Sequence, residues 1–403
     1  MTKAGPAGTL AALSAVPFIM VLGNSMLIPI LPRMMAAMDV SLFQVGLLIT
    51  AFSLPAGIVI PLTGFLSDRL GRKTVMVPAL VVYGLGGLIA GFAALLLSRP
   101  YWVIFAGRIV QGIGAGGTYQ LAMALAGDIF KSNRRAPVLG TLEAANGLGK
   151  VVSPLAGSAA ALLFWFAPFF VYGILSLPVA LLVWLLVKEP LQSKAKKSLS
   201  GYLRTLRGIF RQKALSLAAA YLAGMAVLFT LFGVLSFFSD TLEKRFHIRG
   251  FAAGLIIAIP VLAMAVTSFL AGTLLQKQLS RLLKGSVVAG LALIAVALLL
   301  AIPARGLIPF LSTIVLIGLG TGLVLPGLNT LITSSAAMEE RGLVTALYGT
   351  VRFFGVALGP PAFGWAISMG RGTMFLLNSA ITGAAALLAY FLINEKKMLP
   401  AGR

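Results

Sequence analysis

The sequence contains no cysteine and a single histidine, His247, among its 403 residues. Without cysteine there is no disulfide, no thiolate nucleophile and no cysteine-ligated metal site. The histidine lies in a polar segment between apolar runs, where we expect an ordinary surface residue rather than a pH sensor. Acids are also scarce, with 10 aspartates and glutamates against 32 lysines and arginines. A membrane-embedded enzyme needs reactive groups clustered at one depth, and this inventory argues against one.

Charged residues make up only 10% of the chain and hydrophobic residues 59%, and the mean hydropathy is +1.00. This composition predicts an integral membrane protein. No apolar run shows the strict alternation of a barrel strand, so the membrane spans must satisfy their backbone hydrogen bonds as helices. The predicted fold class is therefore all-α integral membrane.

Apolar runs of roughly 20 residues, separated by charges or turn signals, predict twelve transmembrane helices. Their approximate limits are 10–33, 43–66, 74–97, 101–127, 137–159, 166–187, 214–238, 250–274, 285–303, 307–333, 343–366 and 372–393. The long basic segment 188–213, whose one acid is Glu189, divides the chain into six-helix bundles over 1–187 and 214–403. We expect a solvated cytoplasmic linker, and the alternative is a weakly amphipathic helix that lies on the anionic inner leaflet.

The net formal charge is +22. The basic residues do not cluster with interleaved aromatics, which argues against nucleic-acid binding. With the N-terminus inside, 22 of the 32 lysines and arginines fall in the cytoplasm, 7 fall outside, and Arg108, Lys150 and Arg352 lie within spans. This asymmetry predicts that both termini are cytoplasmic.

Two short motifs of the first half recur in the second. Gly64, Leu66, Asp68 and Arg69 recur 208 residues later as Gly272, Leu274, Gln276 and Lys277, and Gly112, Gly114 and Gly116 recur 206 residues later as Gly318, Gly320 and Gly322. The nearly constant offset predicts two parallel six-helix repeats with a substrate site at their interface near the membrane midplane. We expect the glycine runs to allow close helix packing rather than to contact substrate.

The predicted helix 137–159 carries its polar residues along one face. At helical spacing this face reads Glu143, Asn146, Gly147, Lys150, Ser153, Pro154 and Gly157, whereas Leu148, Val151, Val152 and Leu155 form the opposite face. The pattern predicts a helix that turns hydrocarbon to lipid and its charges towards protein or an aqueous cavity, which is typical of a transport site.

The loop between the second and third predicted spans reads Gly64-Phe-Leu-Ser-Asp68-Arg69-Leu-Gly71-Arg72-Lys73. Position by position it resembles the signature loop of the major facilitator superfamily. Three further stretches resemble the twelve-span drug:proton antiporters of that superfamily: Leu22-Gly23-Asn24 through Pro32; Arg108, Gln111, Gly112 and Gly114; and Gly149, Pro154 and Gly157. Ser153 and Lys150 depart from the last of these patterns.

The resemblance implies two pseudo-symmetric six-helix bundles that export substrate by alternating access in exchange for protons, with the proton gradient in place of any cofactor. It also implies that Asp68 and Arg72 form a gating relay with Asp128, and that Arg108 influences a nearby proton-accepting acid. The other relay positions are Gly64, Arg69, Gly71 and Lys73. Alternatively, the loop charges only anchor the loop to lipid headgroups.

Glu143 is the only carboxylate well inside a predicted span. If coupling requires a carboxyl that changes charge, Glu143 is the proton-coupling candidate, since desolvation favours its neutral form. The alternative is a permanently ionised Glu143 paired with a cation from another helix, such as Arg352.

Candidate substrate-binding residues come from predicted spans one, four, five, seven, ten and eleven: Asn24, Gln111, Tyr119, Asn146, Lys150, Tyr221, Phe232, Asn329, Arg352 and Phe353. Each alone is also a reasonable packing residue. Three cations against one carboxylate favour an anionic or zwitterionic small molecule or lipid-like substrate. We expect a monomeric, proton-coupled exporter in a bacterial inner membrane. The alternatives are a flippase for a lipid-linked molecule, a non-coupled facilitator and a non-transporting receptor.

Overall fold

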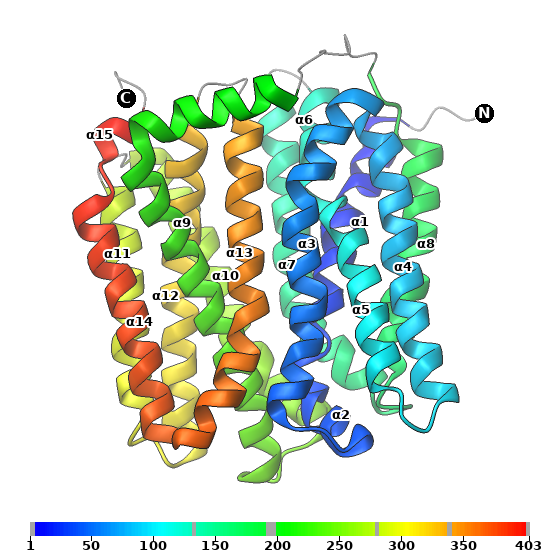
Figure 1. Ribbon diagram of the computed structural model, residues 1–403, viewed down its shortest axis with the longest axis vertical. Coiled ribbons are helices and arrows are strands. Elements are labelled where there is room, and N and C mark those ends of the chain that lie inside the picture. The colour runs from blue at the N-terminus through cyan, green and yellow to red at the C-terminus, as the bar shows by residue number, and fades with distance from the viewer. Residues whose placement is uncertain (1–4, 131–133, 191–198, 279–281, 337–340, 400–403) are drawn as a thin grey trace. The chain divides into compact units, whose positions relative to one another are not determined.

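The computed structural model describes residues 5–130, 134–190, 199–278, 282–336 and 341–399, and within these ranges every regular element is a helix (Figure 1). Its contacts divide the chain into two units. Unit 1 comprises Met1–Lys196 and Ile248–Leu255, and unit 2 comprises Lys197–His247 and Ile256–Arg403.

The helices up to residue 190 belong to unit 1. They are α1 (Pro6–Ser25), η1 (Ile28–Ile30), α2 (Leu31–Met38), α3 (Leu42–Leu70), α4 (Arg72–Leu96), α5 (Tyr101–Gly116), α6 (Tyr119–Ile129), α7 (Arg135–Ala160) and α8 (Ala167–Leu186). The later helices are α9 (Leu199–Lys244), α10 (Gly250–Gln278), α11 (Leu283–Ala301), α12 (Leu307–Ser334), α13 (Arg341–Ala366), η4 (Ile367–Met369), α14 (Arg371–Leu392) and α15 (Glu395–Met398).

Two predicted spans are interrupted in the structure. The span predicted over 10–33 consists of α1, a 3-10 turn at η1 and α2, because Pro29 and Pro32 have no amide hydrogen to continue the helical bonding. The span predicted over 101–127 breaks between α5 and α6, where Gly117 and Thr118 leave helical geometry.

Ten helical segments of the described chain are long and apolar enough to cross a membrane. Helices α5 and α6, into which the predicted span 101–127 is divided, are not among these ten, because they have only 16 and 11 residues. Helix α7 has 26 residues, but its polar face lowers its hydropathy. Helix α9 bends at Lys213, and its first part, which falls within the predicted linker, runs crosswise to the rest (Figure 1).

Glycines bring helix backbones into close contact in the same pattern in both units. A Cβ atom added at Gly112 would lie 2.1 Å from the carbonyl oxygen of Phe52, and one at Gly318 would lie 2.3 Å from that of Pro260. One turn further, Gly116 and Gly322 meet the carbonyl oxygens of Ala56 and Met264 at 2.8 and 2.6 Å. The α3–α5 contact in unit 1 therefore recurs as the α10–α12 contact in unit 2. As expected, these glycines serve helix packing.

A second glycine-mediated helix contact also recurs in both units, between the first helix of the unit and its fifth span. A Cβ at Gly149 would lie 3.1 Å from the carbonyl oxygen of Phe18, which joins α7 to α1. A Cβ at Gly355 would lie 2.3 Å from that of Met225, which joins α13 to α9. The structure thus extends the internal repeat from two sequence motifs to the packing of four helix pairs.

Candidate functional site

The structure brings the three charged residues of the predicted relay together at one end of unit 1. The Nε atom of Arg72 lies 2.6 Å from Oδ2 of Asp128, and its Nη2 atom lies 4.0 Å from Oδ1 of Asp68. The Asp128 side chain is 25% exposed and the Asp68 side chain 51% exposed, so the first pair is the stronger. Arg69 instead stacks over the Phe65 ring, 4.4 Å from its centroid.

Gly71 and Lys73 act with a residue that the sequence analysis did not select, Glu189. Gly71 has a φ of +105°, and a Cβ there would lie 2.7 Å from a Glu189 carboxylate oxygen. The Glu189 carboxylate accepts the backbone N–H groups of Arg72 and Lys73 at the start of α4. In return, Nζ of Lys73 donates to the carbonyl oxygens of Trp184 and Val187, both at 2.6 Å.

This exchange caps two helix termini at once, since α4 gains an anion at its N-terminus and α8 a cation at its C-terminus. Gly64, another predicted relay position, makes no close helix contact among the described residues, since a Cβ atom there would meet nothing within 4 Å. Glu189 could have been noticed as the one acid of a basic segment, but its partners lie 116 and 117 residues away.

Arg108 is completely buried inside unit 1, and the groups that surround it are neutral. Its Nε atom donates to the carbonyl oxygen of Leu48 at 3.1 Å, and Nη1 donates to that of Gly23 at 2.7 Å. Nη1 also donates to Oε1 of Gln111 at 2.6 Å, and Nη2 donates to Oδ1 of Asn24. Among the described residues Arg108 forms no ion pair. The guanidinium therefore ties α1, α3 and α5 together through amide and carbonyl oxygens.

Three predicted substrate-binding residues are buried in this unit. Asn24 accepts from Arg108 and donates to Oγ of Ser53 at 2.7 Å, and Gln111 is fully buried beside the same arginine. Asn146 is 6% exposed and lies 3.5 Å from the Pro17 carbonyl oxygen. Asn146 belongs to the polar face predicted for helix 137–159, and there it packs against α1, whereas Asn24 and Gln111 are enclosed beside Arg108. This placement counts against direct contact with substrate.

Glu143 and Lys150 lie further from the core of unit 1. Glu143 is exposed and accepts a hydrogen bond from the Tyr119 hydroxyl, which joins α7 to α6. Lys150, two turns along α7, is half-buried. Among the described residues Glu143 forms no ion pair, so the structure gives no support to a fixed counter-ion.

In unit 2, Arg352 lies on α13 against an aromatic pair. Its Cζ atom lies 5.3 Å from the centroid of the Tyr348 ring, and that ring stacks on Tyr221 of α9 with centroids 5.9 Å apart. Tyr348 was not selected from the sequence, although its position one turn before Arg352 could have signalled it. The other candidates of this unit, Phe232, Asn329 and Phe353, are half-buried.

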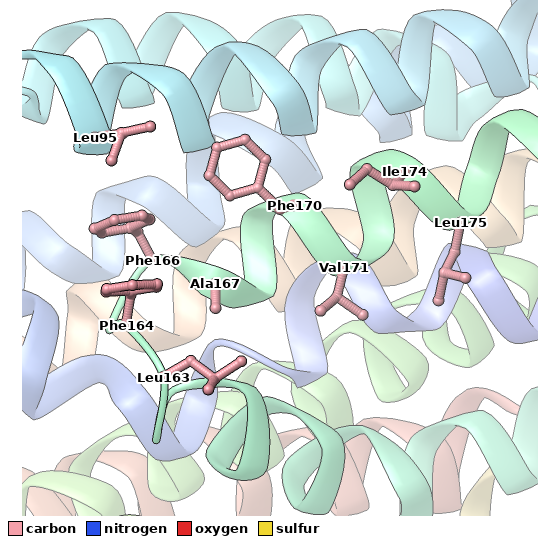
Figure 2. A pocket seen from close by; sticks show the side chains of 9 residues that line it. All are labelled: Leu95, Leu163, Phe164, Phe166, Ala167, Phe170, Val171, Ile174 and Leu175. Atoms are coloured by element: carbon pink, nitrogen blue, oxygen red, sulfur yellow. The ribbon is translucent and has the colours of Figure 1, made fainter.

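A pocket of about 480 Å³ lies between the start of α8 and the end of α4 (Figure 2). Its lining is entirely apolar, with Phe164, Phe166 and Phe170 facing Leu95 across it. None of the predicted site residues contributes to it. A pocket without a polar group has nothing to orient a charged solute.

The comparisons with known proteins agree with the motifs. A sequence profile described as the Major Facilitator Superfamily matches residues 13–360 and 241–402. The chain belongs to the major facilitator superfamily. It is 38% identical over 389 residues to the bacillibactin exporter of Bacillus subtilis strain 168, covering 96% of both chains. It is 27% identical over 395 residues to the class D tetracycline resistance protein of Salmonella ordonez, covering 93% of this chain and 94% of that one.

Solved structures show the same fold. A bacterial homologue of the human lysosomal transporter Spinster, in an inward-facing and occupied conformation, superposes with a TM-score of 0.79 at 18% identity and full coverage of both chains. The family and these relatives make this chain a membrane transporter related to efflux proteins, and not an enzyme.

Proposed function

We propose that this protein is a proton-coupled exporter of small organic anions or zwitterions that crosses a bacterial inner membrane twelve times. The observation that carries the proposal is the 38% identity, over nearly the whole of both chains, with an exporter of bacillibactin. The twelve spans follow if α5 with α6, and also α7, cross the membrane beside the ten apolar segments. Cytoplasmic termini follow from the distribution of lysine and arginine.

Glu143 is the proposed proton carrier. Its carboxylate is exposed and is held by a neutral tyrosine hydroxyl, so it can gain a proton without leaving a paired cation uncompensated. The preference for anions rests on the surplus of cations, of which Lys150 and Arg352 are half-buried. The remaining expectations are a monomer, a proton gradient as the energy source, and contact of the basic segment with anionic lipids.

The test uses purified protein in proteoliposomes with an imposed pH gradient and bacillibactin as the first substrate. Glu143→Gln keeps the shape and hydrogen bonding of the side chain but cannot titrate, so uphill transport should stop while downhill exchange continues. Asp39→Asn is the matched control, because it also replaces a carboxylate by an amide, at an exposed position outside the predicted spans. It should retain uphill transport.

Uphill transport by the glutamine variant would remove Glu143 from the mechanism. Substrate movement that never responds to the gradient, in the wild type as well, would favour a non-coupled facilitator. Transport of a lipid-linked molecule in preference to bacillibactin would favour a flippase.

A further inference from the structure

In the part of the chain that the structure describes, Arg352 has no acidic partner. Its side chain is half-buried, and its Nε atom is buried without a hydrogen-bond acceptor. Among the described residues it forms neither an ion pair nor a hydrogen bond, and its guanidinium lies over the Tyr348 ring. Buried donors without acceptors are rare in folded proteins, and they often mark the place of an absent partner.

Two tyrosines, Tyr348 and Tyr221, pack beside Arg352 and are held in place by their own contacts. Tyr348 is 2% exposed, and its hydroxyl is also buried without a partner. Tyr221 stacks on it and is itself fixed by a 2.9 Å hydrogen bond to the carbonyl oxygen of Val344. A Cβ at Gly224 would lie 2.5 Å from the Tyr348 ring, so this glycine leaves the space that the ring occupies.

This arrangement stabilises a guanidinium without neutralising its charge. A cation over an aromatic face is stabilised by the ring quadrupole, but the Nη hydrogens remain available as donors. A guanidinium recognises two neighbouring oxygens of a planar anion through parallel hydrogen bonds. A lysine in its place would keep the charge and lose this geometry.

We propose that Arg352, supported by Tyr348 and Tyr221, is the anion-recognition residue of the transporter, and that it binds a planar organic anion with two adjacent oxygens, such as a carboxylate. The inference rests on the proposed function in one respect, since it assigns the ligand to the transported substrate.

The experiment measures equilibrium binding to the full-length protein in nanodiscs without any gradient, by titration calorimetry. The probes are benzoate and its neutral, nearly isosteric analogue benzamide. The wild type should bind benzoate more tightly than benzamide. Arg352→Gln should weaken benzoate binding about tenfold or more and leave benzamide unchanged, because only the anion loses charge-assisted hydrogen bonds.

Arg352→Lys separates charge from geometry and should weaken benzoate binding by about three- to tenfold. The matched control is Arg245→Gln, because Arg245 also lies over an aromatic ring, that of Phe246 at 5.8 Å, but is exposed. It should bind both probes as the wild type does. Tyr348→Phe should retain binding, whereas Tyr348→Leu should lose it through loss of the stack.

Equal binding of benzoate and benzamide by the wild type would overturn the proposal, as would unchanged benzoate binding in both Arg352 variants. If the glutamine variant fails to fold, the lysine variant and Tyr348→Leu give the same decision. Failure of proton coupling or of export leaves these binding results intact. The two proposals can therefore fail separately.

Discussion

Two arginines, Arg108 in unit 1 and Arg352 in unit 2, show two different uses of a buried cation. Arg108 is completely enclosed, and its donors are satisfied by four neutral oxygens from three helices. Arg352 is half-buried, rests on a tyrosine and keeps a donor without an acceptor. The first guanidinium holds helices together, whereas the second is the one that we propose binds an external anion.

Replacement of each arginine by glutamine tests this contrast most strongly. Arg108→Gln should lower the free energy of unfolding by about 3 to 5 kcal/mol, because several buried oxygens lose their donor. Arg352→Gln should lower it by less than about 1 kcal/mol, since no hydrogen bond is broken. Thermal unfolding in one detergent, followed by size-exclusion chromatography, measures both. Equal destabilisation of the two variants would contradict the division into a structural and a ligand-binding arginine.

A smaller effect is expected at the helix caps, where the units repeat each other incompletely. Glu189 accepts two N–H groups at the start of α4, and Glu395, 206 residues later, accepts the N–H of Lys284 at the start of α11 at 2.6 Å. Glu189→Ala should therefore destabilise by about 2 kcal/mol and Glu395→Ala by about 1 kcal/mol. The same thermal assay measures both losses of stability. A larger loss in Glu395→Ala than in Glu189→Ala would show that the second N–H group accepted by Glu189, that of Lys73, contributes little.

The smallest effect is expected in the relay, where the two acids, Asp128 and Asp68, should contribute unequally. Asp128→Asn should slow proteoliposome transport about two- to fivefold, because an ion pair of about 0.5 to 1 kcal/mol biases one conformational state. Asp68→Asn should do less, because its pair is longer and more exposed. Both proteins should express normally. A greater loss in the Asp68 variant at equal protein level would mean that Asp68 has a partner more important than Arg72.

Much of the fold follows from the sequence because hydropathy, charge bias and the repeat are all local or periodic signals. The relay positions were predictable because Asp68 and Arg72 lie in one loop motif. The surroundings of Asn24 and Asn146 could not be predicted. Asn24 was selected from a motif, and helical spacing placed Asn146 on a polar face without identifying what packs on it. Tyr348 and Glu189 were not predicted as site residues, for a related reason. Their importance lies in contacts with Arg352 and α4 that only the folded chain reveals.

The two glutamate caps have a practical consequence for work with separate polypeptides. Glu189 closes α4 within unit 1, and Glu395 closes α11 within unit 2, so neither unit borrows its cap from the other. A gene divided after residue 190 would encode two fragments that each keep their own capping carboxylate. Co-expression of such fragments should therefore allow complementation, whereas a division before Glu189, or a truncation before Glu395, would deprive one fragment of a helix terminus.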